Sequence, residues 1–466
     1  MSSSSSPRHV AIIGMGLVGC LAALGLAKRF SWEVDIYESR SSTSQAIDDN
    51  KTINLALSNR GLRSFEEIDP RLAAELVRQS VPLYGRTIHK SDGKTEFQAY
   101  GPRGEAIYSV NRLTMIALLK EAIDACPLIT THYSRKLLKS DGRNLVFEDP
   151  ATGERTSASA DLVIGADGAY STVREQMRRV IKMDLTTRWA PLSYMKIEVP
   201  PMVRPDGNTD HAFDPTTLHV WPRKDFLLIA PSNPDKTFTC VLWAPESLLE
   251  GLRDKEAATH FLQEQFPSFV AATCSADVVK QVTTGPIVPM SSTKCFPMND
   301  ADRILIGDAA HAIVPYLGHG ANVGFEDVRI LLECLEREVD QVSALDAYSR
   351  IRRDDLEAIE AISWGHNKEL GQSVLEISYR IRKSLDFFLA RLFPGRWAPL
   401  YAAVTFEAGT PYSKVIERHQ RQQRIIRTLT WFVSTLLLLT LWRVLGQPGL
   451  VTFLHLFMLD QAFCSA

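Results

Sequence analysis

The residues whose types and spacing most clearly indicate ligand binding lie between Arg303 and Asp327, in the sequence RILIGDAAHAIVPYLGHGANVGFED. The apolar run Ile304 to Ile306 predicts a strand, and Asp308 follows at its carboxyl end, where open α/β sheets bind ligands. The loop and helix start that follow contain Pro315, Gly318, Gly320, Ala321, Asn322 and Gly324. A bare backbone that enters a helix N-terminus suits the polar or anionic edge of a cofactor. The alternative is a strand, loop and helix that bind no ligand.

A second glycine-rich segment follows an apolar strand predicted at Val10 to Ile13 and precedes a predicted helix. The segment GMGLVG contains Gly14, Gly16, Leu17, Val18 and Gly19. A second predicted strand then ends at Glu38, 19 residues past the last of these glycines. Together these elements form the dinucleotide-binding fingerprint, in which glycines admit a pyrophosphate and the acid holds a ribose hydroxyl. An acid at this point favours FAD or NAD, because a 2′-phosphate would be repelled.

Three more residues are candidates for ligand contacts. Asp167 follows a strand predicted at Leu162 to Ile164 and marks a second ligand-facing strand end. Arg86 and Tyr100 are polar residues in two neighbouring predicted strands. An arginine at such a position can form a bidentate pair with a carboxylate, although a solvent-exposed strand arginine explains the pattern equally well.

The composition disfavours several classes of protein. The net charge of −2 with 23% charged residues gives no reason to expect a nucleic-acid partner. The seven cysteines are scattered and contain no C-x-x-C pair, so we expect a reduced intracellular protein with neither disulfides nor a metal site. The leader MSSSSSPRH lacks the apolar core of a secretory signal, which indicates that the chain starts in the cytosol.

A basic and apolar segment lies near the carboxyl terminus. Arg418, Arg421, Arg424 and Arg427 precede Thr428 to Trp442, which is 15 residues without a charge. At ~1.5 Å per residue this run spans roughly 22 Å, short of the ~30 Å hydrocarbon core of a bilayer. The pattern favours a tail that lies in or crosses a membrane surface. A terminal helix buried in the core or in a dimer is the alternative.

With these segments assembled, the chain resembles the single-component FAD-dependent aromatic hydroxylases, and within them the enzymes that hydroxylate kynurenine. The resemblance covers nearly the whole chain. The matching segments are GMGLVG, INLALSNRG, PLYGRTIH, QAYG, YSVNR, GADGAYSTVR, GDAAHAIVPYLGHGANVGFED, NPDKTFTC and PLYAAVTF. The general motifs identify only the cofactor, whereas INLALSNRG, PLYGR and NPDKTFTC are much narrower.

The resemblance implies an α/β fold with a Rossmann-like FAD-binding domain, an inserted antiparallel β-sheet substrate domain and a helical C-terminal region that ends in a membrane-associated helix. The expected segments are 1–182 and 299–340 for the FAD-binding domain, 183–298 for the substrate domain, 341–420 for the helical region and 421–466 for the tail. Split in this way, the cofactor domain would bind substrate at the seam between the two domains.

The resemblance also implies a set of cofactor residues. They are Gly14, Gly16, Leu17, Val18, Gly19, Glu38, Arg40, Ala56, Arg112, Leu137, Asp167, Asp308, Pro315, Gly318, Gly320, Ala321 and Asn322. Glu38, with Arg40 and Ala56 beside it, would lie along the adenosine half of FAD. Asp308 would lie at the ribityl and phosphate region, and residues 321 and 322 against the isoalloxazine.

Arg86, Tyr100 and Tyr401 match positions that hold the amino-acid end of kynurenine in this family. The implied reaction uses NADPH and O₂ to convert L-kynurenine to 3-hydroxy-L-kynurenine through a flavin C4a-hydroperoxide, in tryptophan degradation and NAD biosynthesis. The flavin carries this chemistry, so we expect no catalytic residue in the protein. Eukaryotic members lie on the outer mitochondrial membrane, held by the carboxyl tail, with the catalytic part facing the cytosol.

Two departures from the family pattern affect the expected substrate site. His319 and Ala321 stand in a loop where the family usually has glutamine and methionine, and His366 stands where a helix presents asparagine, with Glu369 kept. We include His319, His366 and Glu369 among the candidate substrate residues. A paralogous flavin hydroxylase of another aryl amine or aromatic secondary metabolite is one alternative. A non-catalytic membrane-bound flavin-binding module is another.

Overall fold

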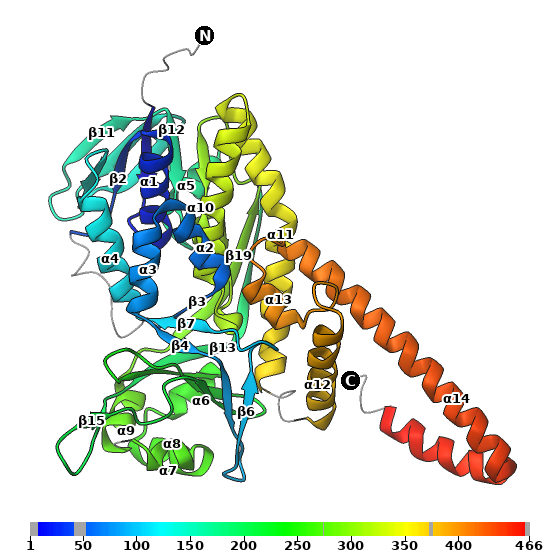
Figure 1. Cartoon of the computed structure of the whole chain (residues 1–466). Helices are drawn as coiled ribbons and strands as arrows, with labels where there is room; N and C mark the ends of the chain where they lie inside the picture. The colour runs from blue at the N-terminus through cyan, green and yellow to red at the C-terminus, as the bar shows by residue number, and fades with distance from the viewer. Residues whose placement is uncertain (1–7, 42–52, 274, 372–375, 462–466) are drawn as a thin grey trace. The chain divides into compact units, whose positions relative to one another are not determined.

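The computed structural model describes residues 8–41, 53–273, 275–371 and 376–461. The chain divides into two compact units, Met1–Ser413 and Lys414–Ala466. The first unit contains the sheets and most of the helices, and the second is the greater part of one long helix (Figure 1).

A five-stranded parallel sheet is the base of the first unit, with the order β20-β12-β1-β2-β8. Its strands are β1 (His9–Ile13), β2 (Glu33–Tyr37), β8 (Ile129–His132), β12 (Leu162–Gly165) and β20 (Arg303–Leu305). Strand β12 is buried along its whole length, as expected for a strand covered on both faces. Strand β20 lies more than one hundred residues after β12 in the sequence but pairs with it, so two distant parts of the chain form one sheet.

Helices and a small sheet cover the parallel sheet. The helices are α1 (Leu17–Phe30), α2 (Asn59–Ile68), α3 (Pro70–Arg78), α4 (Arg112–Asp124), α5 (Thr172–Met177) and α10 (Gly320–Arg337), and the sheet contains β9 (Lys136–Asp141), β10 (Asn144–Glu148) and β11 (Arg155–Ser159). Tyr37 of β2 stacks on Phe147 of β10, with ring centroids 4.2 Å apart. Helix α1 packs closely on α10, because a Cβ at Gly25 would lie 2.6 Å from the side chain of Leu332.

An eight-stranded sheet, β21-β19-β13-β18-β17-β16-β5-β6, lies beside this layer. Its strands are β5 (Gly85–His89), β6 (Thr95–Ala99), β13 (Asp184–Val199), β16 (Leu218–Pro222), β17 (Leu227–Ala230), β18 (Phe238–Ala244), β19 (Val288–Phe296) and β21 (His311–Ala312). The sheet is antiparallel, as expected, except that β16 pairs in parallel with β5. Strands β5, β6 and β21 come from outside the segment 183–298, so the sheet joins the expected substrate segment to the flanking sequence.

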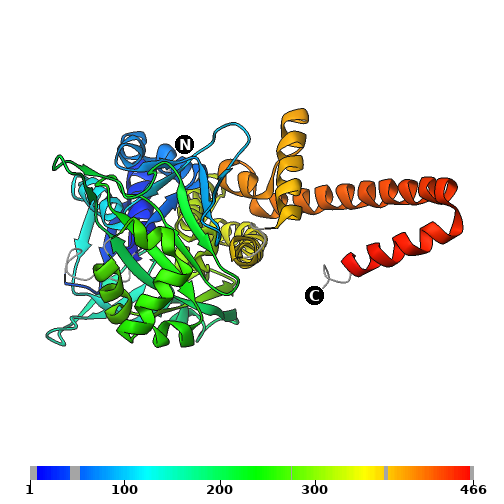
Figure 2. The same ribbon diagram turned by 90° about the horizontal axis from the view of Figure 1, so that it is seen from below.

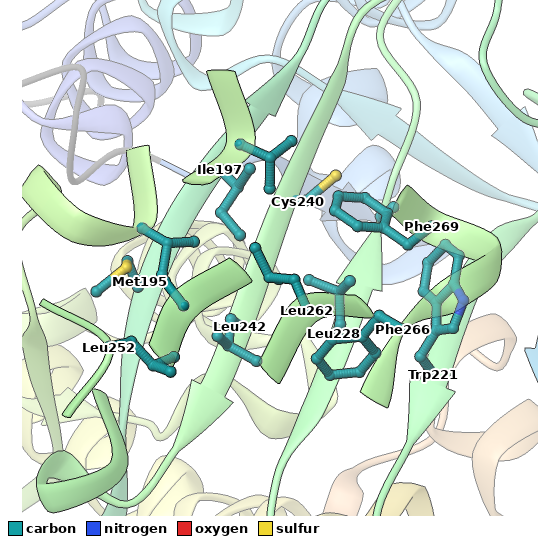
Figure 3. Close-up of a cluster of buried hydrophobic side chains, with 14 of the residues drawn as sticks. Met195, Ile197, Trp221, Leu228, Cys240, Leu242, Leu252, Leu262, Phe266 and Phe269 are labelled. Atoms are coloured by element: carbon teal, nitrogen blue, oxygen red, sulfur yellow. The ribbon is translucent and has the colours of Figure 1, made fainter. Parts of the chain in front are cut away.

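Four helices lie on one face of the eight-stranded sheet (Figure 2). They are α6 (Glu246–Gly251), α7 (Lys255–Gln265), α8 (Pro267–Ala271) and α9 (Ser275–Thr284). Their apolar side chains and those of the strands form a buried cluster that includes Trp221, Leu242 and Phe266 (Figure 3). Successive side chains of a strand point to opposite faces, so Val220 and Trp243 belong to a second cluster on the other face. That other face can form one wall of a binding site.

The remaining strands form two small sheets, and four more helices complete the chain. The strands are β3 (Leu55–Leu57), β4 (Val81–Leu83) and β7 (Ile107–Val110) in one sheet and β14 (Met202–Val203) and β15 (Thr209–Asp210) in the other. The helices are α11 (Gln341–Gly371), α12 (Ile377–Leu392), α13 (Leu400–Phe406) and α14 (Tyr412–Gln461). The expected helical C-terminal region is therefore confirmed. Among the described residues, none of the helices combines the length and apolarity needed to cross a bilayer.

Candidate active site

A cavity of about 330 Å³ opens at the carboxyl ends of β1, β12 and β20, against the free face of the eight-stranded sheet. This is the strand-end position expected for a ligand of an open α/β sheet. The expected cofactor residues in its wall are Gly16, Leu17, Val18, Ala56, Arg112, Asp308, Pro315, Gly318, Gly320 and Ala321. The expected substrate residues in its wall are Arg86, Tyr100, His366 and Tyr401.

Helix α1 begins at this cavity without a side chain that caps it. Gly14 has a φ of +103°, and a Cβ there would lie 2.5 Å from the carbonyl oxygen of Ala166. A Cβ at Gly19 would lie 2.2 Å from the carbonyl oxygen of Gly14, so both glycines are needed for the turn itself. At Gly16, the N-cap, a Cβ would meet nothing within 4 Å. Gly16 therefore leaves open space in front of unpaired helix N–H groups, which favour an anion.

A second pocket contains Glu38 and shares Gly16, Ala166 and Gly168 with the first. Its other expected cofactor residues are Gly14, Arg40, Leu137 and Asp167. Glu38 accepts hydrogen bonds from the backbone N–H of Met15 at 3.0 Å and from Arg40 Nε at 2.8 Å. Burial acts to raise the pKa of Glu38, but the hydrogen bonds from Arg40 outweigh it and lower the pKa below its ordinary value. The result is an ionised acceptor suited to a ribose hydroxyl.

Asp167 lies at the end of β12, in the wall of the same second pocket. It accepts hydrogen bonds from the backbone N–H groups of Thr172 at 2.7 Å and Val173 at 3.2 Å. Its other carboxylate oxygen is buried and has no partner among the residues that the structure describes. Burial raises the pKa of Asp167. A buried acceptor without a donor calls for one from a bound ligand.

Asp308 faces the first cavity from the short 3₁₀ helix Gly307–Ala309. Its carboxylate is exposed to the cavity but is otherwise surrounded by protein, and this burial raises its pKa. The backbone N–H of Gly307 donates to Asp327 at 2.8 Å, which fastens the loop to α10. Helix α10 itself begins at Gly320 without a capping side chain. The uncapped N-termini of α1 and α10 thus open on one cavity.

Ala56 and Asn322 are hydrogen-bonded to each other beside the first cavity. Asn322 is absent from the cavity wall, because its Oδ1 accepts from the backbone N–H of Ser58 at 2.8 Å and its Nδ2 donates to the carbonyl oxygen of Ala56 at 2.7 Å. Ala56 lines the first cavity and not the pocket that contains Glu38. The reason is that β3 pairs with β7, which sets Ala56 opposite Ser109. The expected place of Ala56 along the adenosine half of FAD stays a prediction.

Arg86 lies in the wall of the first cavity and is only 3% exposed. Its guanidinium stacks over the ring of Tyr401, 4.7 Å from the centroid, and 5.6 Å from that of Tyr100. The two tyrosine rings are stacked on each other at 5.0 Å. Strand β5 supplies Arg86 and α13 supplies Tyr401, so the structure brings together residues that are more than three hundred positions apart.

His366 and Glu369 extend from α11 to Arg86. His366 Nε2 lies 3.2 Å from Arg86 Nη2, and its Nδ1 lies 2.9 Å from Glu369 Oε2. Glu369 also forms an ion pair with Arg86 Nη1 at 3.4 Å, but it is not part of the cavity wall. Burial lowers the pKa of His366, so the imidazole is neutral near Arg86. Burial alone would raise the pKa of Glu369, yet His366 and Arg86 outweigh it and lower the pKa.

His319, the other departure from the family pattern, does not face the cavity. Its Nδ1 lies 2.8 Å from the carbonyl oxygen of Leu317, and its Nε2 lies 3.4 Å from Thr405 Oγ1. Burial lowers its pKa to about 4, so the ring is neutral. The structure therefore separates the two histidines, and only His366 borders the site.

Several residues near the site carry no signal that the sequence analysis recognised. Among them, Leu218, Ile229, Trp243 and Tyr316 line the cavity. Leu218, Ile229 and Trp243 lie on strands of the eight-stranded sheet, where only the alternation of the strands could have selected the cavity-facing positions, and Tyr316 lies in the 3₁₀ helix Pro315–Leu317. On α12, Tyr379 donates to Glu369 at 2.7 Å and Lys383 lies close enough to be affected by the charge of Arg86.

The arrangement fits FAD. Two connected pockets share Gly16, one with an ionised acceptor for ribose and the other with two uncapped helix N-termini for a pyrophosphate and a polar ring edge. In the described part of the chain, three polar atoms of the cavity wall are buried without partners: Tyr100 Oη, Trp243 Nε1 and Tyr316 Oη. Such atoms are expected where a ligand completes the hydrogen bonds.

Comparison with known proteins agrees with this geometry. The model of the FAD binding domain family matches residues 8–363. Kynurenine 3-monooxygenase of Candida albicans is 34% identical over 438 residues, which cover 92% of this chain and 95% of the relative. Kynurenine 3-monooxygenase of Saccharomyces cerevisiae is 36% identical over 438 residues, which cover 90% of this chain and 94% of the relative.

Solved structures share the fold at lower identity. A 2-methyl-3-hydroxypyridine-5-carboxylic acid oxygenase is 20% identical with a TM-score of 0.65, over 82% of this chain and 96% of that one. Pseudomonas aeruginosa PqsL, solved in complex with 2-aminobenzoylacetate, is 19% identical with a TM-score of 0.65, over 79% and 97%. Together with the family match and the relatives above, these findings show that the chain is an FAD-dependent monooxygenase that belongs to the kynurenine 3-monooxygenase family.

Proposed function

We propose that this flavoprotein monooxygenase converts L-kynurenine, NADPH, a proton and O₂ to 3-hydroxy-L-kynurenine, NADP⁺ and water. Bound FAD supplies the redox chemistry, since it takes electrons from NADPH and activates O₂ for transfer of one oxygen atom to an aromatic ring. The residues of the chain bind and orient the substrate, and they keep water from the reacting ring. Kynurenine activates its own ring through the aryl amine, so the protein supplies no nucleophile.

The observation that carries this proposal is the buried cation at the substrate end of the cavity. Arg86 is 3% exposed, and the ring of Tyr401 lies under its guanidinium. Its Nη1 bond to Glu369 is long, at 3.4 Å. A substrate carboxylate can form a shorter, charge-assisted pair with the guanidinium. The unpartnered hydroxyl of Tyr100 supports a further hydrogen bond to the same carboxylate.

The rest of the cavity suits an aromatic ring. Leu218, Ile229 and Trp243 form an apolar wall from the eight-stranded sheet. Such a wall excludes water from the ring position that is hydroxylated, which limits wasteful reduction of O₂. Asp308 and the start of α10 form another part of the cavity wall, where the ring system of FAD would lie. We propose the cofactor and substrate residues named above in these roles.

Mass spectrometry of the products tests the proposal. The purified FAD-loaded chain is incubated with NADPH, O₂ and kynurenine, and we expect a product heavier by one oxygen atom. With ¹⁸O₂ the added oxygen carries the label. NADPH oxidation that kynurenine accelerates without a hydroxylated product would identify kynurenine as an effector and would overturn the proposed substrate. No NADPH oxidation at all would favour a flavin-binding module.

His366 supports a related aryl amine as the second candidate substrate. Like Ala321, it is a departure from the family pattern that lines the cavity, and its Nε2 is 3.2 Å from Arg86 Nη2. An imidazole in this position changes the hydrogen bonds available to the amino-acid end. The same assay with 2-aminobenzoyl carboxylates of different chain length distinguishes the candidates, because the preferred substrate has the highest kcat/KM.

We further propose that the carboxyl tail holds the enzyme on a membrane, with the outer mitochondrial membrane as the site and the catalytic part facing the cytosol. Basic residues of α14 precede exposed apolar ones, among them Trp431 at 75% and Phe432 at 67% exposure. A basic stretch beside aromatic and apolar side chains favours a membrane surface. We expect the protein in the mitochondrial membrane fraction, sensitive to protease added outside. Recovery in a soluble fraction would contradict this proposal.

A further inference from the structure

Helix α12 has its apolar side chains on the outside. Ile381, Leu385, Phe388 and Leu392 are 65%, 38%, 61% and 56% exposed. Their spacing of four, three and four residues places them on one stripe of a helix. Phe393, which follows the helix, is 46% exposed and extends the stripe. A helix on the surface of a globular protein normally turns such a stripe toward the core.

The opposite face of α12 is polar and makes contacts with the protein. Tyr379 donates to Glu369 at 2.7 Å. Asp386 accepts from Trp397 Nε1 at 3.1 Å and from Arg382 Nε at 3.1 Å. The bonds to Glu369 of α11 and to Trp397 fix the rotation of the helix, because turning the apolar stripe inward would break them, whereas the Arg382–Asp386 bond lies within α12. These contacts of the polar side chains therefore turn the apolar stripe outward.

Basic residues surround the stripe. Arg380, Arg391 and Arg396 are exposed, whereas Arg382 pairs with Asp386 and Lys383 is half-buried within reach of the charge of Arg86. Arg380, which also pairs with Glu96 at 3.2 Å, and Arg391 are exposed and lie eleven residues apart, about three turns, so they stand on the same flank of the stripe. An apolar stripe with a basic flank is complementary to a bilayer surface with acidic headgroups, whereas an acidic flank would be repelled.

We propose that α12 is an interfacial helix: its stripe Ile381, Leu385, Phe388 and Leu392 dips into the headgroup region of an anionic lipid bilayer, and Arg380, Arg391 and Arg396 contact the lipid headgroups. The helix has 16 residues with charges along its length, so it lies on the surface and does not cross it. This contact is separate from the tail of residues 414–466 and concerns the unit that contains the active site.

Hydrogen–deuterium exchange on the full FAD-loaded chain tests this inference. Exchange of peptides from residues 377–393 is compared in buffer, with phosphatidylcholine vesicles, and with vesicles that also contain phosphatidylserine. At lipid about ten times the half-saturating concentration, we expect exchange in α12 to slow about tenfold with the anionic vesicles and less with the neutral ones. Peptides of α14 report the tail in the same experiment, so the two membrane contacts are read separately.

A pair of matched variants completes the design. Ile381→Ser with Phe388→Ser should abolish the vesicle-dependent protection of α12, while Val203→Ser with Val339→Ser, at positions 70% and 101% exposed, should leave it intact. The FAD absorbance of each variant verifies folding. Exchange in α12 that vesicles leave unchanged would overturn the proposal. So would protection in buffer alone that grows with protein concentration, which would identify a second copy of the chain as the occupant.

Discussion

Arg86 shows what a single residue in this site has to do. It is buried beside two aromatic rings, yet its hydrogen bonds to His366 and Glu369, at 3.2 and 3.4 Å, are both longer than a good charge-assisted bond. An arginine carries five N–H donors in a fixed fork, so donors remain for a ligand. Glu369 keeps the cation in place before substrate arrives.

Replacing Arg86 by Met should raise the KM for kynurenine about tenfold to a hundredfold, because a charged hydrogen bond contributes about 1.5–3 kcal/mol. The FAD content should not change, since Arg86 lies at the substrate end of the cavity. Steady-state kinetics and the ratio of flavin to protein absorbance measure the two effects. Arg86→Lys keeps the charge without the fork and should recover part of the affinity. Loss of FAD in Arg86→Met would show that the residue belongs to the cofactor site instead.

We expect Lys383 to give the site a pH dependence. Burial and the nearby charge of Arg86 lower the pKa of Lys383 to about 7. Below that pH the ammonium is charged and adds to the attraction for a carboxylate, and above it the charge is lost. We therefore expect the KM for kynurenine to rise about threefold to tenfold as the pH passes upward through about 7. In Lys383→Met the KM should be high and flat across this range, and an unchanged pH profile would exclude Lys383 as its cause.

At the scale of elements, short α13 depends on a residue from α2. Arg60 is 1% exposed; its Nε donates to the carbonyl oxygen of Val404 at 2.6 Å and its Nη2 to that of Thr410 at 2.6 Å. Its Nη1 pairs with Glu326 at 3.1 Å. Arg60 thus occupies one carbonyl group in the last turn of the helix that carries Tyr401 and one in the loop that follows it.

Arg60→Met should destabilise the protein by about 3 kcal/mol, because it leaves buried carbonyl groups and Glu326 short of a partner. It should also raise the KM for kynurenine, since α13 loses the contact that holds Tyr401 in position. Urea unfolding and steady-state kinetics provide the two numbers. Arg78→Met, on the exposed end of α3, is the matched control and should change stability by less than about 0.5 kcal/mol.

Gly16 separates a cofactor effect from a folding effect. A Cβ at this position meets no protein atom within 4 Å, so Gly16→Ala should fold normally. It places a methyl group in front of the free N–H groups of α1, where the pyrophosphate would bind, and should weaken FAD binding about tenfold or more. Flavin fluorescence titration of the apoprotein measures this. Gly251→Ala, also with open space around its Cβ, should leave FAD affinity unchanged.

Local signals in the sequence were enough for the cofactor side of the fold. The glycines around Gly14, the strand that ends at Glu38 and the loop after Asp308 each lie within one short segment, so their chemistry could be inferred without tertiary structure. The contacts of Ala56 and Asn322 required the tertiary structure, because they depend on which strand pairs with β3. The inward polar face of α12 was likewise invisible, since polar residues on a helix usually face water.

At the scale of the whole molecule, the site depends on two sheets that meet at one cavity. Gly16 and Asp308 lie at the ends of parallel strands, whereas Trp243 belongs to the eight-stranded sheet. A ligand that fills the cavity contacts both sheets at once, so its binding energy stabilises the first unit as a whole. The sequence predicted both sheets but not that β5, β6 and β21 would join the second one.

Removal of FAD should therefore lower the thermal stability of the entire first unit. At a free FAD concentration about 100 times the dissociation constant, the expected loss is about 2.7 kcal/mol. Differential scanning calorimetry of holoprotein and apoprotein measures it, and a single transition that shifts as one is expected. A transition that splits, with only part of the unit responding, would show that the two sheets unfold independently.

The late arrival of β20 affects how the protein is made. The ribosome releases β1, β2 and β12 long before Arg303 emerges, and the chain grows at only about 5–20 residues per second. During that interval the edge of β12 lacks its neighbour, and Asp308 does not yet exist. We therefore expect a nascent chain to retain flavin only after the segment from Arg303 to Asp327 has emerged, so that the vitamin-derived cofactor is captured late in synthesis.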